Sequence, residues 1–215
     1  MTSSTEPIKM GRSHTTRRRS GRVRQEEVVE AATKLFHKGG YHGTSMQDIA
    51  DAVGLQKGSL YLHLTSKEAL LSHIVIDGLT EILHPMEVIA NSDASPLEKL
   101  EEAVKHHVST NVMKQDGVGV FLEDSKHLSP GKRRKALGLQ KRYESLIRNI
   151  LEEGIRVGQF RPCDTKIVAY ALLGMCNWTY RWCSKKGPLS PEEVARIFVD
   201  VLITGIGAQT TQEIP

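Results

Sequence analysis

The sequence predicts an all-α protein built from two domains. Apolar residues recur at helical spacing through most of the 215-residue chain, and no stretch shows the strict alternation typical of strands. Segments rich in Asn, Ser, Pro and Gly, such as 91–96 and 128–131, separate the helical stretches. This length suffices for a small N-terminal domain and a larger one that buries a core or a ligand cavity. We expect an arm over 1–22, domains over 23–68 and 69–207, and a tail over 208–215.

The amino-terminal arm concentrates positive charge. The first 24 residues carry seven Lys and Arg residues against one Glu, whereas the whole chain has a formal net charge of +4. Because the segment has almost no apolar residues, it cannot bury a core, and we expect it to be disordered. Its cations suit the phosphates and minor groove of DNA, with a solvated tail as the alternative. The candidate DNA contacts in this arm are Arg17, Arg18, Arg19 and Arg22.

The first helix is predicted over 25–38. Apolar residues from Val28 to Phe36 form one stripe along it, and Gly39 and Gly40 provide a stop signal. This helix is expected to brace the elements that follow.

Two short helices around a glycine turn come next. The Thr44 hydroxyl and Gln47 can form a capping box, so a helix is expected to begin at about Ser45. Gly54 then suits a left-handed turn. The second helix is expected over 57–64, with Leu60 and Leu64 facing inward. This layout is typical of a helix-turn-helix that enters a DNA groove.

The stretch from Arg24 to Leu71 resembles the N-terminal domain of the tetracycline-repressor (TetR) family of bacterial regulators. The glycine turn, the aromatic residue of Tyr-Leu-His-Leu and the following Ser-Lys-Glu match together in spacing. The resemblance implies phosphate contacts by Thr44, Tyr61, His63 and Lys67. It also implies positions at or near base edges for Gln56, Lys57, Gly58, Ser59 and Leu62. Ordinary packing or solvent exposure is the alternative for Tyr61, Leu62 and His63.

A longer helix is expected to connect the two domains. Thr65 and Glu68 suggest a capping box at its start, and Pro85 is expected to interrupt it. Further helices are predicted over 96–113, 118–125, 131–157, 166–185 and 191–205.

The last two predicted helices suit a dimer interface. The final one carries a broad apolar stripe consisting of Val194, Ile197, Phe198, Val201, Leu202 and Ile206. Paired with their copies, these helices would form a four-helix interface. A twofold homodimer would place two recognition helices in successive major grooves of a near-palindromic site.

The segment Asn-Trp-Thr-Tyr-Arg-Trp, followed by Gly-Pro-Leu-Ser-Pro-Glu-Glu, resembles the TetR subgroup that responds to acyl-coenzyme A thioesters and controls fatty-acid or steroid breakdown. Asn177 and Arg181 are i, i+4 neighbours, as are Trp178 and Trp182. A polar pair beside a stacked aromatic pair would suit a phosphate, an adenine ring or an acyl chain. Dimer or core packing is the alternative.

Other classes of function find little support. The chain contains none of the common phosphate-loop, nucleophile-elbow or zinc-protease motifs, so we do not expect an enzyme. Cys163, Cys176 and Cys183 do not have metal-ribbon spacing, and nothing completes a metal site around His106 and His107. The basic run 132–135 is expected to be a solvated face or a contact for an acidic ligand.

We therefore expect a dimeric repressor that binds double-stranded operator DNA and that a small effector, an acyl-coenzyme A thioester, releases. A regulator of multidrug or other apolar ligands is the alternative, and a scaffold that binds DNA without sequence preference is a further one. No cofactor is expected. The sequence shows no signal peptide or membrane anchor, so a cytoplasmic location is expected.

Overall fold

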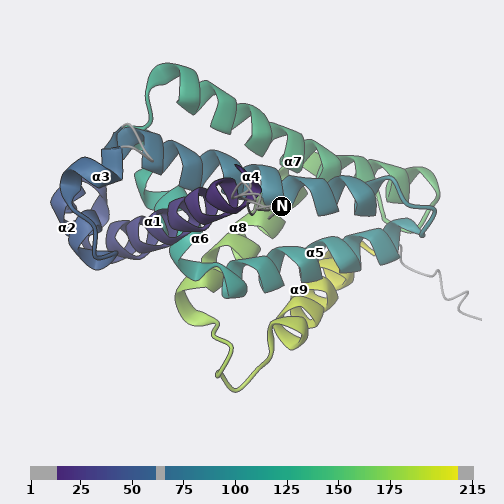
Figure 1. The fold of residues 1–215 in the computed structure, drawn as a ribbon. Helices are drawn as coiled ribbons and strands as arrows, with labels where there is room; N and C mark the ends of the chain where they lie inside the picture. The colour runs from purple at the N-terminus through teal and green to yellow at the C-terminus, as the bar shows by residue number, and fades with distance from the viewer. Residues whose placement is uncertain (1–13, 62–65, 208–215) are drawn as a thin grey trace, which may run out of the picture.

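The computed structural model describes residues 14–61 and 66–207, with side chains from residue 25 onward. Over these residues the regular elements are helical, apart from one isolated bridge between Phe160 and Gly207. The elements are α1 (His14–Gly43), α2 (Met46–Ala52), α3 (Lys57–Tyr61), α4 (Lys67–Ala90), α5 (Pro96–Met113), α6 (Gln115–Asp124), the 3₁₀ turn η1 (Ser125–His127), α7 (Pro130–Arg156), α8 (Thr165–Trp182) and α9 (Pro191–Ile206). The all-α prediction is confirmed. Figure 1 shows α2 and α3 at one end of the molecule and α9 beside α5.

Helix α1 begins earlier than expected. Its backbone is helical from His14, so the predictions of a start at Gln25 and of disorder over the whole arm are wrong for residues 14–22. Arginine is a good helix former, and no proline interrupts the chain between Pro7 and Pro85. The side chains of the predicted contacts in this stretch, Arg17, Arg18, Arg19 and Arg22, lie outside the described residues. The predicted stop is confirmed by a helix break at Gly40, which has a φ of 72°.

The cap of α2 is one residue later than predicted. Ser45 is the N-cap, and its hydroxyl accepts from the Asp48 N–H at 3.1 Å. The Asp48 carboxylate accepts from the Ser45 N–H at 2.7 Å and so completes the capping box. Thr44 does not cap α2, because its hydroxyl is directed at α1, where it lies 3.1 Å from the carbonyls of Leu35 and Gly40. The predicted turn glycine, Gly54, has a φ of 64°.

Helix α4 also starts and ends differently from the prediction. Ser66, rather than Thr65, caps it by accepting from the Ala69 N–H at 3.0 Å. The helix continues through Pro85 to Ala90. A proline there removes the N–H that would bond the Glu81 carbonyl. The ring Nε2 of His106 lies 3.1 Å from the nearby Ile82 carbonyl, which gives that oxygen a partner from outside the helix.

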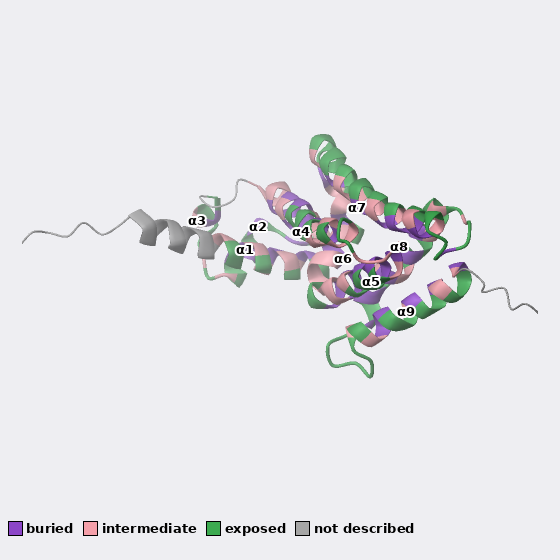
Figure 2. Ribbon diagram, turned by 90° about the vertical axis from the view of Figure 1, so that its right-hand side faces the viewer, coloured by how far each residue is buried: buried purple, intermediate pink, exposed green. Residues whose placement is uncertain are grey.

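Two hydrophobic clusters share α4. One joins the first four helices around Phe36, Ile49, Leu60 and Leu70, and it also includes Val120, Leu128 and Ala136 from α6, the end of η1 and α7. The other lies among α4, α5 and α7 to α9, around Leu100, Ile150 and Leu172. Figure 2 shows buried residues on the inward faces of these helices and exposed ones outside. Because α4 contributes to both clusters, a movement of this helix changes the packing in both halves of the protein.

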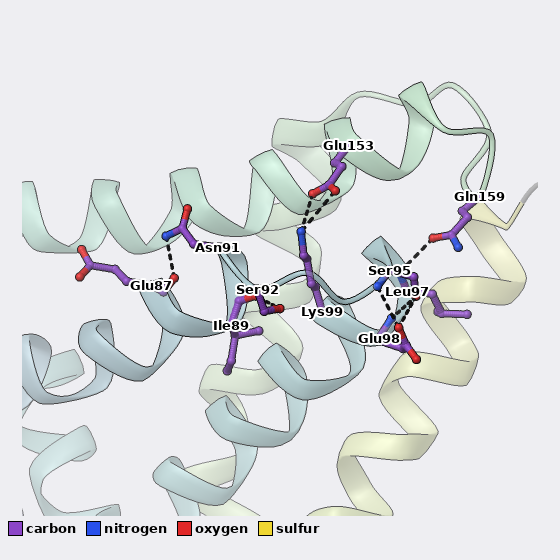
Figure 3. Close-up of polar contacts among 10 residues, drawn as sticks. All are labelled: Glu87, Ile89, Asn91, Ser92, Ser95, Leu97, Glu98, Lys99, Glu153 and Gln159. Atoms are coloured by element: carbon purple, nitrogen blue, oxygen red, sulfur yellow. Dashed lines mark hydrogen bonds and ion pairs between the residues drawn. The ribbon is translucent and has the colours of Figure 1, made fainter.

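Polar contacts join the start of α5 to the end of α7 and to the segment that follows it, beside the C-terminal end of α4 (Figure 3). Lys99 on α5 is only 7% exposed, and its ammonium lies 2.9 Å from the Glu153 carboxylate on α7. The Gln159 side chain accepts from the Leu97 N–H at 3.1 Å. Helix α5 has the predicted bounds, and α9 ends one residue beyond its predicted end. Helix α6 starts three residues before its predicted start, and α8 stops at Trp182 rather than at residue 185.

Candidate DNA-binding surface and internal cavity

The short helix α3 presents an exposed face. Leu60 is fully buried and anchors α3 on the first hydrophobic cluster. Around it Gln56, Lys57 and Gly58 are exposed and Ser59 is half-buried, while Tyr61 is 44% exposed. Leu62, His63 and Leu64 lie outside the described residues. The exposed face is free to enter a groove, and the individual base and phosphate contacts stay predictions.

Thr44 and Lys67 fix the corner between α1 and α2. The Lys67 ammonium donates to the carbonyls of Tyr41, at 2.7 Å, and Thr44, at 2.8 Å. It also lies 4.3 Å from the centre of the Tyr41 ring. Thr44 is buried. Both side chains therefore position the helix-turn-helix in this structure, and their phosphate contacts stay predictions.

The corner between α1 and α2 also contacts the segment between α6 and α7. The His42 Nε2 and His127 Nδ1 atoms lie 3.1 Å apart, and the Tyr41 ring stacks on the His127 ring. Burial and the nearby His42 lower the pKa of His127. The Glu68 carboxylate accepts from the Ser129 N–H and pairs with Lys132. Sequence reasoning missed this junction because its partners lie tens of residues apart in the chain.

The four residues of the basic run on α7 differ in their surroundings. Lys132 pairs with Glu68 of α4, whereas Arg133, Arg134 and Lys135 are exposed. The solvated-face expectation therefore holds for three of its four residues.

A cavity of about 170 Å³ lies inside the larger half of the molecule. Its apolar lining comes mostly from α4, α6 and α8 and includes Ile74, Val75, Leu79, Ile82, Val118, Phe121 and Leu173. Polar side chains at the same cavity are His107, Thr110, Asn111, Lys114, Gln140, Tyr143 and Asn177. Helix α4 thus borders the cavity with residues one to three turns beyond its contacts with the helix-turn-helix.

Three of these polar side chains form a hydrogen-bonded chain, here called the polar relay. His107 Nδ1 lies 3.0 Å from the Tyr143 hydroxyl, and His107 Nε2 lies 3.0 Å from Asn177 Oδ1. Burial lowers the pKa of His107 to about 4, so its ring is neutral near pH 7. Burial also raises the pKa of the Tyr143 hydroxyl. The relay is therefore an uncharged hydrogen-bonding element at the wall of an apolar cavity.

A wider open groove of about 760 Å³ adjoins the cavity. The two share Ile74, Gly78, Lys114 and Gly117 in their linings. The groove is bordered by charged residues of both signs, and the Lys34 and Lys114 ammonium groups are paired with Glu30 and Glu81. Lys185 and Lys186, just after α8, are exposed at its rim. Lys114 thus stands between an apolar chamber and a polar entrance.

The four residues predicted to bind an effector do not form one surface. Asn177 lines the cavity, whereas Trp178 is 58% and Trp182 52% exposed. The Trp178 ring contacts Tyr180, and the Trp182 ring contacts Phe198 of α9, so the predicted stacked tryptophan pair is wrong. Arg181 pairs with Glu123 and lies 5.1 Å from the Trp178 ring centre. Consecutive side chains point about 100° apart on a helix, which separates Asn177 from Trp178.

Sequence reasoning missed His107 and Tyr143 as cavity residues. The sequence signal available was the polar position at His107 within the apolar pattern of α5, next to buried Val104 and Val108. Its partners are 36 and 70 residues away, and no local spacing relates them.

Comparison with known proteins identifies the family. Residues 28–74 match the family described as bacterial regulatory proteins of the tetR family, and residues 93–206 match the tetracyclin repressor-like C-terminal domain. The chain belongs to the TetR family of bacterial regulators. Its resemblance to this family is therefore confirmed, and the homologues reported below are transcriptional regulators rather than enzymes.

Several members of the TetR family cover most of the chain. The HTH-type transcriptional repressor KstR2 of Mycolicibacterium smegmatis is 30% identical over 85% of this chain and 90% of its own length. The structure of PfmR from Thermus thermophilus superposes with a TM-score of 0.77 at 36% identity, over 82% of this chain and 97% of that one. AibR, solved with isovaleryl coenzyme A and operator DNA, gives a TM-score of 0.75 at 28% identity, over 83% and 97%. The resemblance to regulators that respond to acyl-coenzyme A thioesters is thus confirmed.

Two further features of the described residues bear on other kinds of partner. No helix in 14–61 and 66–207 is long and apolar enough to cross a membrane. In the same part of the chain, no three His, Cys, Asp or Glu side chains gather as a metal site would require.

Proposed function

We propose that this TetR-family protein is a cytoplasmic homodimeric repressor that binds a near-palindromic operator and leaves it when a small effector occupies the cavity. The observation that carries the proposal is the position of α4. This helix begins six residues after the end of α3, contributes Leu70 and Leu71 to the first hydrophobic cluster, and lines the cavity with Leu79 and Ile82. An effector that prefers one tilt of α4 would change the separation of the two recognition helices.

An acyl-coenzyme A thioester is the effector class that the lining favours. The apolar chamber suits an uncharged acyl group, and Lys185 and Lys186 at the rim of the groove suit the phosphates of the coenzyme. The bound isovaleryl coenzyme A of the similar AibR supports the same class. An uncharged drug-like ligand is the second candidate, favoured by the apolar side chains that α4, α6 and α8 contribute to the chamber. No cofactor and no catalytic step are part of this proposal.

An exposed apolar face supports the homodimer. It consists of Ile167, Tyr170, Trp178 and Trp182 on α8 and Ile197 and Val201 on α9. Six large apolar side chains on two adjacent helices suit a partner of the same kind. A second copy of this chain would cover them in a four-helix arrangement, and twofold symmetry would present two α3 helices to the DNA.

Operator binding with and without ligand tests the proposal. A duplex selected from a random library should bind more tightly than a scrambled duplex at the same salt concentration, and a short-chain acyl-coenzyme A should weaken that binding. The same thioester should raise the melting temperature, since it binds the folded state. Equal affinity for both duplexes would favour the non-specific scaffold, and equal operator affinity with and without a bound ligand would contradict effector release.

A charge variant separates the two effector classes. Replacing Lys185 and Lys186 by Gln should weaken thioester binding about tenfold, because each lost phosphate contact removes a charge-assisted hydrogen bond. Replacing Lys105 and Lys166 by Gln, which are exposed and do not line the groove, is the matched control. If the Lys185 and Lys186 variant binds the thioester as tightly as the control does, the phosphates do not use this rim.

A further inference from the structure

The polar relay joins three of the seven polar side chains that line the chamber. His107 is buried on α5, and Tyr143 on α7 is buried with it. Burying polar groups is unfavourable unless they are hydrogen-bonded, and an apolar core of the same shape would not need the relay. Because the relay borders the cavity, its polarity is available to a ligand as well as to the fold.

The directions of the hydrogen bonds follow from the neutral ring. Asn177 Oδ1 can only accept, so His107 Nε2 carries the proton and donates to it. His107 Nδ1 is then an acceptor, and the Tyr143 hydroxyl donates to it. The chain of donation therefore runs from Tyr143 through His107 to Asn177.

The relay leaves one donor group unused. With Oδ1 turned to His107, the Asn177 amide group Nδ2 has no hydrogen-bond partner among the described residues. Asn177 is half-buried and lines the cavity, so this amide is accessible from the chamber. Lys114 at the mouth does not make the chamber cationic, because its ammonium is already paired with Glu81.

We infer that the Asn177 amide recognises an uncharged acceptor oxygen, a ketone carbonyl, on a short effector chain, and that His107 and Tyr143 position it. The chamber of about 170 Å³ is close in size to an apolar cavity that accepts benzene, which limits the group inside to a few carbons. A carboxylate is disfavoured there, because the relay supplies no cation to balance it. The inference deepens the proposed effector function and rests on it only for the thioester part of the ligand.

Matched ligand pairs test this recognition without depending on one ligand class. In acetoacetyl-coenzyme A a ketone oxygen replaces two hydrogens of butyryl-coenzyme A, and in cyclohexanone a ketone oxygen replaces the exocyclic methylene group of methylenecyclohexane, without a thioester. Dissociation constants are measured by calorimetry or by methyl chemical shifts of the chamber. In the wild-type protein the oxygen-bearing member of each pair gains a hydrogen bond, and cyclohexanecarboxylate should not bind.

The variant Asn177→Leu keeps the shape of the side chain and removes the donor. The affinity ratio within each ligand pair should then shift about three- to tenfold against the oxygen-bearing member, the range expected for one hydrogen bond. Tyr143→Phe should shift the ratio less, because His107 then loses the donor that fixes its tautomer. Thr179→Val is the control, since Thr179 is buried on the same helix, bonds to the Cys176 carbonyl and does not line the cavity.

The outcomes distinguish the Asn177 inference from the proposed thioester effector. A ratio that shifts in Asn177→Leu and not in Thr179→Val supports the inference, and if Asn177→Leu fails to fold, Tyr143→Phe carries the comparison. An unchanged ratio in a folded relay variant overturns it, as does a wild-type protein that binds neither member of the ketone pair. If the ketone pair shows the shift while no thioester binds, the relay assignment stands and the thioester effector is wrong.

Discussion

The two faces of α8 have different surroundings although their residues alternate in sequence. On the inner face Leu173 and Asn177 line the cavity and Cys176 is buried. On the outer face Trp178 and Trp182 are more than half exposed, and Tyr170 is 48% exposed. A shift of one residue turns the side chain by about 100°, enough to move it from a ligand chamber to a surface that suits a partner subunit. Neighbours in a motif thus need not belong to one site.

The largest expected effect comes from charging the outer face. Replacing Trp178 and Trp182 by Glu should raise the dimer dissociation constant at least about 1000-fold, because buried aromatic residues at an interface typically contribute 2 kcal/mol or more each. Operator affinity should fall with dimerisation, whereas ketone binding in the chamber should be retained. Sedimentation velocity and ligand titration measure the two properties. Lys105→Glu on α5 controls for added charge. A variant that stays dimeric and loses ligand binding would reverse the assignment of the two faces.

The sequence predicted the α8 helix but not the division between its faces. Apolar periodicity and Ser or Pro start signals place helices such as α5 and α9 well, because these signals are local. The i, i+4 rule placed Trp178 and Trp182 on one exposed face of α8, although their rings do not stack on each other. It could not say which neighbour faces the chamber, since that depends on where α5 and α7 pack. For the same reason His107 stood out only as a polar position in the apolar pattern of α5, and Tyr143 had no local signal that related it to the cavity.

Capping shows a similar limit on a smaller scale. Thr44 and Ser45 both suit an N-cap, and the sequence alone favoured Thr44. The outcome was decided by the carbonyls of Leu35 and Gly40, which hold the Thr44 hydroxyl against α1 and away from the first turn of α2. The break of α1 at Gly40 brings the Thr44 hydroxyl to these carbonyls, and this break depends on tertiary packing as well as on the local sequence.

Lowering the pH should destabilise the folded protein through His107 at the chamber, and this effect is intermediate in size. The pKa of His107 is about 4 in the folded protein, below the ordinary value of 6.5 that applies to the unfolded chain. Between these values the unfolded chain binds a proton that the folded protein does not, so stability falls as the pH drops from about 6.5 to 4. The loss approaches about 3 kcal/mol per protomer at the lower limit.

Urea unfolding at a series of pH values measures this effect, with His107→Gln as the non-titrating comparison. The variant should show a shallower loss of stability over the same interval. Because the other histidines are present in both proteins, their contributions cancel. Parallel stability profiles for the two proteins would mean that His107 is protonated in the folded state and that the relay is charged.

The smallest expected effect belongs to Arg181 on the outer face. Its side chain is half exposed, pairs with Glu123 and accompanies the exposed ring of Trp178, and surface ion pairs of this kind contribute about 0–1 kcal/mol. Arg181→Gln should therefore leave both the free energy of unfolding and the thioester dissociation constant nearly unchanged. Calorimetry with butyryl-coenzyme A provides the measurement, and Arg156→Gln at the exposed end of α7 is the control. A tenfold loss of thioester affinity confined to Arg181→Gln would place the coenzyme on the outer face, and the functional division of α8 would then have to be abandoned.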